Sequence, residues 1–318
     1  MFIYFSEVLI DNLRGLLIIL VVLGHCIQNL DLDFDHNIVF RYIYSFHMPL
    51  FMFISGFVSY KKEYKFISIK RRFIQLVIPF IAWAMLGLTI QGEYNWTWLT
   101  QPDTGLWFLW VLFWIGVIHI VLSKLSVILK IEENLIFGIS CILFLGILFI
   151  NKLSFGYHLV AWYLPFYLMG SILKRFENQL FPIINKNYFV LGMLFVILAF
   201  YWMRNESPTF ININSQALIF GYKFIVGFIG CLFFISLGQF FDDKILYLSE
   251  LGSGMTLGIY AVHQFVIRLL VHFKIQMDWS DNFWIGVLIA FIFVFGISFL
   301  IYRLIGYSRY ISKILLGK

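Results

Sequence analysis

The feature that most constrains this chain is a series of apolar stretches, each about as long as a lipid bilayer is thick. About 20 consecutive apolar residues cross the hydrocarbon core as a helix, within a range of about 17 to 25. Ten stretches approach or reach this length, and polar or charged residues separate them. They span residues 13–30, 38–60, 73–90, 105–122, 135–150, 158–173, 188–203, 216–237, 250–271 and 283–304.

The composition agrees with lipid as the solvent for these stretches. Hydrophobic residues make up 61% of the chain and charged residues 13%, whereas a soluble domain is about half apolar and a quarter charged. Too little charged surface is left to cover a soluble fold of 318 residues. The sequence therefore predicts an all-α, polytopic membrane helical bundle of about ten transmembrane helices, with residues 1–318 forming a single transmembrane domain.

The lysine and arginine residues orient the predicted bundle. With the N-terminus in the cytoplasm, 17 of the 23 basic residues fall in inside segments and four fall in outside loops. Cytoplasmic loops carry such an excess in membrane proteins, so both termini are predicted to be cytoplasmic. The same bias explains most of the net charge of +6, which therefore implies no nucleic-acid partner.

The first span carries two ionisable side chains, Arg14 and His25, eleven residues apart. Ionisable residues are costly inside a membrane span and point to function. At ~100° and ~1.5 Å per residue the two lie on one helix face, ~16 Å apart along the axis. Gly24, next to the histidine, lets another chain or a ligand approach closely. We expect Arg14 at the cytoplasmic edge and His25 well inside the bilayer.

His47 and His263 are expected at about the same depth as His25. The residue counts put His25 ~18 Å and His263 ~19 Å above the inner ends of their spans, and His47 ~14 Å below the outer edge. In a core ~30 Å thick these depths nearly coincide. Each histidine also has a simpler explanation, as a hydrogen-bonding contact between helices. No close spacing of ligands favours a metal site, and none is predicted.

Residues 61–72 form the strongest basic cluster of the chain. The cluster is either the topology signal itself or a clamp for phosphates, which lysine and arginine bind through charge-assisted hydrogen bonds. Coenzyme A carries such phosphates and is made on the side that this loop is predicted to face. Ser55 and Gly56 allow close helix contact near the inner end of their span. Trp107 has two explanations, because it belongs to an interfacial aromatic belt or stacks on a sugar.

Four motifs, in the right order along the chain, resemble the membrane-bound acyltransferase family 3. In that family an Arg or Lys, ten intervening residues and a His mark the first span, as Arg14 and His25 do here. The second motif is similar to that of the fucose 4-O-acetylase-like branch. One departure is Gln75, which stands where many members place a second arginine before the third-span proline, Pro79. The motifs are residues 9–25, Phe46–Phe57, Leu106–Leu109 and Leu251–His263.

The resemblance implies transfer of an acyl group, usually acetyl from acetyl-CoA, to a hydroxyl of a cell-surface polysaccharide or its lipid-linked precursor. Acetyl-CoA would be a co-substrate, and no bound cofactor is implied. The corresponding roles are catalysis for His25, Arg14 and His47, substrate binding for His263, Trp107, Tyr260 and Ser55, and donor binding for Lys70, Arg71 and Arg72. His25 would act as general base or carry the acyl group, while His47 or His263 would orient it or stabilise the oxyanion.

The expected partners follow from this hypothesis. They are acyl-CoA, a carbohydrate acceptor and the lipid bilayer, with a second copy of the chain or polysaccharide-assembly proteins as further partners. The expected location is the bacterial plasma (inner) membrane. A transporter or flippase for a glycan intermediate also fits ten spans with polar groups, but no inverted repeat or paired broken helices are visible. A non-catalytic partner of a polysaccharide synthase would have no need for the Arg14–His25 face.

Overall fold

The computed structural model describes residues 7–61, 67–91, 98, 106–150, 154–208, 215–240, 246–273 and 282–318. These ranges contain helices and turns and no strand, which confirms the predicted all-α class. Each of the ten predicted spans coincides with a helix. Several boundaries differ, and the first helix begins at Glu7 rather than at residue 13. Of the basic cluster at 61–72, residues 62–66 lie outside the described ranges.

The chain divides into two compact units, and each is described by itself. The first unit comprises Met1–Phe51, Phe176–His263 and Lys274–Ser298, and the second comprises Met52–Arg175, Gln264–Phe273 and Phe299–Lys318. Three helices, α2, α13 and α14, contribute residues to both. The single domain over residues 1–318 stays a prediction.

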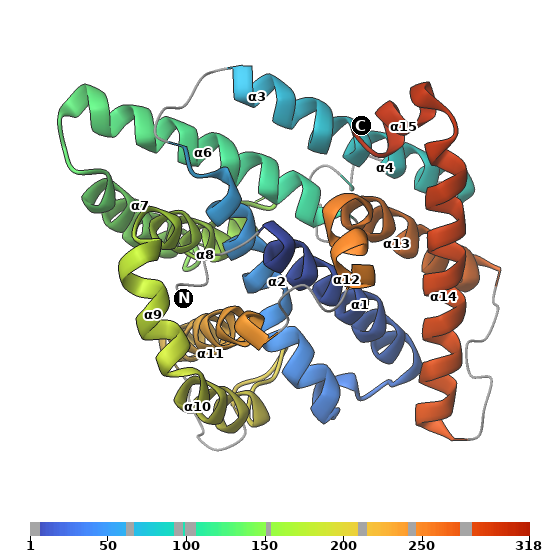
Figure 1. The fold of residues 1–318 in the computed structure, drawn as a ribbon. Coiled ribbons are helices and arrows are strands. Elements are labelled where there is room, and N and C mark those ends of the chain that lie inside the picture. Colours follow the sequence, from blue (N-terminus) through green and yellow to red (C-terminus); the bar gives the residue numbers. More distant parts are fainter. Residues whose placement is uncertain are drawn as a thin grey trace. The chain divides into compact units, whose positions relative to one another are not determined.

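Figure 1 labels the helices of both units. The first unit contains α1 (Glu7–Leu30), η1 (Phe34–His36), the beginning of α2 (Ile38–Ser59), α9 (Glu177–Lys186), α10 (Tyr188–Phe200), α11 (Gln216–Leu237), η4 (Gly238–Phe240), α12 (Leu246–Glu250), the π-helical η5 (Leu251–Met255) and the beginnings of α13 (Thr256–His272) and α14 (Phe283–Gly306). The second unit contains the end of α2, α3 (Ile67–Arg72), the π-helical η2 (Phe73–Val77), α4 (Ile78–Gln91), α6 (Trp107–Leu129), α7 (Glu133–Ile147), α8 (Tyr157–Arg175), the ends of α13 and α14, and α15 (Arg309–Leu315).

In the described ranges, seven helices are long and apolar enough to cross a membrane, or eight if the pair α9 and α10, bent by 69°, counts as one span. The chain is therefore a multi-pass membrane protein. The predicted spans 135–150 and 158–173 correspond to α7 and α8, of which α7 is too short and α8 is not apolar enough to be counted. Ten spans and two cytoplasmic termini stay predictions. Helix α9 was not predicted from the sequence, which indicated only a connecting segment there.

In the first unit, α1 packs directly on the helix formed by α12 and η5 (Figure 1). Gly15 faces the backbone carbonyl of Leu248, and Gly252 faces the backbone carbonyl of Asp11, so that a Cβ at either glycine would overlap a backbone oxygen. Small residues permit this approach of two helix backbones in a membrane. The contact fixes how the later turns of α1 and α13 meet.

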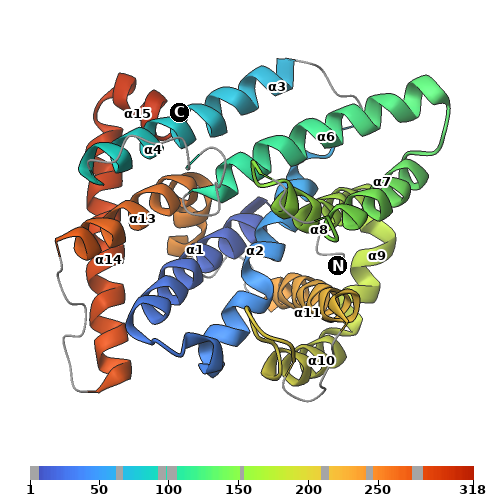
Figure 2. The same ribbon diagram turned by 180° about the vertical axis from the view of Figure 1, so that it is seen from behind.

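The helices α10 and α11 lie side by side in the first unit (Figures 1 and 2). Gly192 of α10 leaves room for the ring of Phe233 on α11. The hydroxyl of Tyr42 on α2 donates to the carbonyl of Val196 at 2.9 Å. This bond connects α10 to the helix that carries His47.

In the second unit, α2 and α8 approach each other at two glycines. Gly56 faces the carbonyl of Tyr167, and Gly170 faces the carbonyl of Phe53. The close contact that the sequence suggested at Ser55 and Gly56 therefore exists at Gly56. Nearby, the indole N–H of Trp83 on α4 donates to the carbonyl of Leu315 in α15 at 2.8 Å.

Replacing Gly15 by alanine should destabilise the protein, because the new Cβ meets a backbone carbonyl that cannot move alone. We expect the free energy of unfolding in detergent to fall by about 1–3 kcal/mol, as in other overpacked interiors. Gly296→Ala is the matched control, since nothing lies within 4 Å of its Cβ position. Equal unfolding midpoints for the two variants would contradict the backbone contact.

Candidate functional site

The structure brings His25, Tyr44, His47 and His263 together in the first unit; we refer to these four residues as the histidine cluster. The ring centroids of His25 and His263 are 5.3 Å apart. The Tyr44 ring lies 6.1 Å from the His25 ring and 4.7 Å from the His47 ring, in edge-on arrangements. Helices α1, α2 and α13 thus contribute one histidine each, as the depths counted from the sequence suggested.

His47 and His263 are oriented by the backbone of their own helices. Nδ1 of His47 lies 2.7 Å from the carbonyl of Ile43, and Nδ1 of His263 lies 3.0 Å from the carbonyl of Ile259. A carbonyl can only accept, so each Nδ1 carries a hydrogen, and in the neutral ring Nε2 is then an acceptor. Both side chains are buried. Nε2 of His263 has no hydrogen-bond partner among the described residues.

His25 is held by side chains instead of by its own backbone. Its Nδ1 lies 3.3 Å from the hydroxyl of Tyr44, which in turn donates to Oε1 of Gln28 at 3.0 Å. Gln28 also forms a side-chain hydrogen bond with His25. The tautomer that fits the tyrosine contact has its hydrogen on Nδ1 and a lone pair on Nε2. Unlike the other two histidines, which are buried, His25 is partly exposed.

Tyr44 owes its position to Gly24 and Phe40. A Cβ at Gly24 would lie 2.7 Å from a ring carbon of Tyr44, so the ring rests directly on the α1 backbone. The ring of Phe40 stacks on that of Tyr44, with centroids 3.9 Å apart and planes 24° apart. The glycine beside His25 therefore receives a side chain of the neighbouring helix, which is one of the two possibilities that the sequence left open.

Arg14 forms an ion pair within its own helix. Its Nη1 lies 3.2 Å from Oδ1 of Asp11, one turn earlier on α1, and both side chains are partly buried. Tyr260 packs its ring 5.7 Å from that of His263 on the same helix and is itself buried. Among the predicted site residues, His25, His47, His263, Arg14 and Tyr260 thus belong to the first unit.

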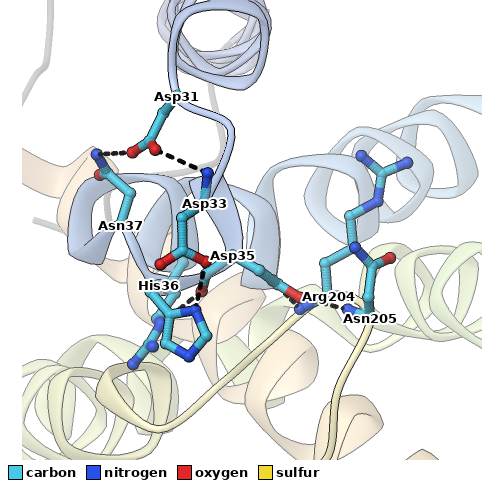
Figure 3. A network of polar contacts seen from close by, with 8 residues as sticks. Asp31, Asp33, Asp35, His36, Asn37, Arg204 and Asn205 are labelled. Atoms are coloured by element: carbon cyan, nitrogen blue, oxygen red, sulfur yellow. Dashed lines mark hydrogen bonds and ion pairs between the residues drawn. The ribbon is translucent and has the colours of Figure 1, made fainter.

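A second arginine approaches the histidine cluster from the segment after α10. The guanidinium of Arg204 lies 5.3 Å from the centre of the Tyr44 ring. The buried carboxylate of Asp35 accepts hydrogen bonds from the backbone N–H groups of Arg204 and Asn205, at 2.6 and 2.8 Å (Figure 3). We call this pair of bonds the Asp35 clamp. It connects the segment after α10 to the turn between α1 and α2.

Arg72, by contrast, is occupied within the second unit. Its Nη2 donates to Oγ of Ser59 at 2.7 Å and to the hydroxyl of Tyr167 at 3.1 Å. Gly116 on α6 faces the same guanidinium. Contact of Arg72 with the phosphates of the donor stays a prediction. Lys70 and Arg71, its neighbours on α3, are exposed.

The remaining predicted residues also lie in the second unit. The indole of Trp107 stacks on the ring of Tyr163, with centroids 5.1 Å apart and planes 18° apart. Ser55 lies on α2 next to the helix contact at Gly56. Gln75, the departure from the family pattern, falls in the π-helical turn η2, where its backbone meets Gly317 near the end of the chain.

Four polar residues that lie in or near these sites were not predicted from the sequence. They are Tyr44, Gln28, Arg204 and His119. Tyr44 and Gln28 precede or follow a histidine by three residues, a spacing that puts both on its helix face, so the sequence carried a signal for them. Arg204 and His119 carried no comparable signal. His119 is buried on α6, 3.0 Å from Oγ of Ser171 on α8, and only folding brings these partners together.

In the parts of the chain that the structure describes, no group of three or more His, Cys, Asp or Glu side chains is arranged to hold a metal ion.

Comparison with known protein families adds to this geometry. Residues 8–303 match the family described as Acyltransferase domain, which is nearly the whole chain. The chain belongs to this family. The match includes all three histidines and every other residue predicted for the site. The resemblance seen in the sequence motifs is thus confirmed at the level of the family.

Two relatives, both named Nodulation protein NolL, are similar over shorter segments. The protein from Mesorhizobium japonicum is 33% identical over 121 residues, which cover 32% of this chain and 32% of the relative. The protein from Sinorhizobium fredii is 40% identical over 88 residues, which cover 25% of this chain and 24% of the relative. The matched segments thus span about a third or less of these curated relatives. No solved structure matches the chain.

Replacing Arg72 by glutamine should destabilise the protein, because Ser59 and Tyr167 lose a charged donor. Hydrogen bonds to charged groups contribute about 1.5–3 kcal/mol each, and we expect a loss of that size in the free energy of unfolding in detergent. Arg71→Gln, one residue away on an exposed position, should change it by less than about 0.5 kcal/mol. The reverse order of the two effects would exclude a structural role for Arg72.

Proposed function

We propose that the protein is a membrane-bound O-acyltransferase that moves an acetyl group from acetyl-CoA to a hydroxyl of a cell-surface polysaccharide or its lipid-linked precursor. One observation carries this proposal. In a chain of the acyltransferase family, a partly exposed histidine in the first span has its Nδ1 against a tyrosine hydroxyl and a second histidine beside it. A base held in one tautomer and one orientation is what acyl transfer to a hydroxyl needs.

In the proposed reaction, His25 acts as the general base. Its Nε2 takes the proton of the acceptor hydroxyl while the hydroxyl oxygen attacks the thioester carbonyl carbon. The carbon–sulfur bond then breaks, and the leaving thiolate takes the proton back from His25. The hydroxyl of Tyr44 accepts from Nδ1–H throughout and keeps the ring in place. In the alternative route, the same Nε2 carries the acetyl group before the acceptor arrives.

His263 and His47 are proposed to position His25 rather than to donate to the oxyanion. Both use their Nδ1–H on a backbone carbonyl, so their neutral rings present only a lone pair at Nε2. The ring centroid of His263 lies 5.3 Å from that of His25, so His263 can restrict the orientation of the His25 ring by packing against it. This favours orientation of His25 over stabilisation of the oxyanion, the other role considered for these residues.

Donor binding is proposed for Lys70 and Arg71. Both are exposed on α3, and their charges suit the phosphates of coenzyme A. Arg72 is proposed to support them by holding the adjacent helix to α2 and α8. Arg14, paired with Asp11, is proposed to line the donor side of α1. Trp107, Tyr260 and Ser55 stay proposals for acceptor contacts, and the bacterial plasma membrane stays the proposed location.

The proposal is tested with labelled acetyl-CoA and membranes that contain the intact protein or its His25→Gln variant. General base catalysis contributes about 10²- to 10⁴-fold, so incorporation of label into the surface glycans of the host should fall by at least about a hundredfold. His272→Gln is the matched control, because this histidine is exposed at the end of α13. Label that does not depend on His25, in a host that supplies the acceptor, would contradict the mechanism. No label with any variant would favour glycan transport.

Replacing Tyr44 by phenylalanine removes the hydroxyl but keeps the ring that packs on Gly24 and Phe40. The loss of one orienting hydrogen bond should lower kcat about tenfold, with the KM for acetyl-CoA unchanged. Steady-state kinetics of acetyl transfer measure both constants. A raised KM with an unchanged kcat would place Tyr44 in donor binding instead.

A further inference from the structure

The side chain of Arg204 is exposed, but its backbone is held by hydrogen bonds. The Asp35 clamp holds the N–H groups of Arg204 and Asn205. Nζ of Lys223 donates to the carbonyl of Arg204 at 2.9 Å. Two hydrogen bonds of its own backbone and one of the next residue therefore fix the position of Arg204, and none of them uses its guanidinium.

The guanidinium of Arg204 takes no part in these hydrogen bonds. It extends away from the Asp35 carboxylate (Figure 3) and makes no hydrogen bond or ion pair within the described ranges. The basic side chains nearby, Arg41 and Lys223, donate hydrogen bonds to backbone carbonyls. Arg41 donates to the carbonyls of Asp35 and Phe200, at 2.8 and 3.1 Å.

The position of this unused guanidinium is next to the proposed base. It lies over the Tyr44 ring at 5.3 Å, and Tyr44 contacts His25 through its hydroxyl. The charge of Arg204 also interacts with His25 and His47. Arg14, assigned to the donor side, is eleven residues from His25 along α1, or ~16 Å at 1.5 Å per residue, and the Asp35 turn follows the opposite end of that helix.

We propose that Arg204 binds an anionic oxygen group, a phosphate or a carboxylate, on the acceptor. This inference rests on the proposed acyl transfer, because it assigns the acceptor side of the same site. A guanidinium stacked over an aromatic ring keeps its N–H edge open, and that edge matches the paired oxygens of both anions. The fixed distance from this anchor to His25 then decides which acceptor hydroxyl reaches the base.

Two sources can supply the anion, and they differ in chemistry. One is the diphosphate of a lipid-linked sugar, and the other is the carboxylate of an acidic sugar. Binding is measured by titration calorimetry on the full-length protein in nanodiscs, with two pairs of probes. Farnesyl diphosphate is compared with farnesol, and methyl glucuronoside with methyl glucoside. We expect one anionic probe to bind about tenfold or more tightly than its neutral partner, and the pair that shows this identifies the source.

The variants decide whether Arg204 is responsible. Arg204→Gln should weaken binding of the preferred anionic probe by about tenfold to a hundredfold, and Arg204→Lys should weaken it less because the charge remains. Asp35→Asn, which loosens the clamp, should lie between the intact protein and Arg204→Gln. Arg303→Gln is the matched control. Arg303 is also exposed with its guanidinium 5.4 Å from an aromatic ring centre, and its variant should bind as the intact protein does.

Two results would overturn the inference. In the first, neither anionic probe binds better than its neutral partner. In the second, Arg204→Gln and Arg303→Gln bind the anionic probe equally well. Because the titration requires no acetyl transfer, it is independent of the test of the proposed function. Arg204-dependent binding without any transfer would refute the acyl transfer and keep the anion site, while transfer without Arg204-dependent binding would do the opposite.

Discussion

The contact between the backbones of α1 and the α12–η5 helix is the constraint on which the site depends. Gly15 and Gly252 let each helix touch a carbonyl of the other, and this approach aligns the later turns that carry His25 and His263. Association of helices in a bilayer relies on packing rather than on a hydrophobic driving force. The two glycines therefore set how closely the two helices approach. The imidazole rings of His25 and His263, about three turns further along the chain, depend on this approach.

The three histidines of the cluster differ in the groups that orient their rings. His47 and His263 use the carbonyl one turn earlier, a partner that every helix provides. His25 is instead oriented by the side chains of Tyr44 and Gln28, which substitutions can change. His25, whose hydrogen-bond partners are side chains, is also the partly exposed histidine of the three. The other two are buried and have a fixed tautomer, which agrees with the proposed division into one reactive ring and two supporting rings.

The sequence predicted the long helices, because these depend on the length and periodicity of apolar stretches. It did not predict contacts between segments that are far apart in the chain. Each of the ten apolar stretches coincides with a helix, and residue counts along three of them placed His25, His47 and His263 at one level. Helix α9 was not found because its composition is nearly balanced between polar and apolar residues. The hydrogen bonds of Arg72 to Ser59 and Tyr167 could not be predicted, because these partners are 13 and 95 residues away. The Asp35 clamp joins residues 169 and 170 positions apart, which no local pattern encodes.

The Asp35 clamp recognises backbone amides, and this has a consequence for how the protein family can vary. Every amino acid except proline supplies the N–H group that Asp35 accepts, so position 204 can change its side chain while the loop keeps its place. The segment after α10 therefore keeps its position whichever side chain it carries at residue 204. If Arg204 binds the acceptor as proposed, one substitution there changes the acceptor preference without any adjustment of the helices that hold His25.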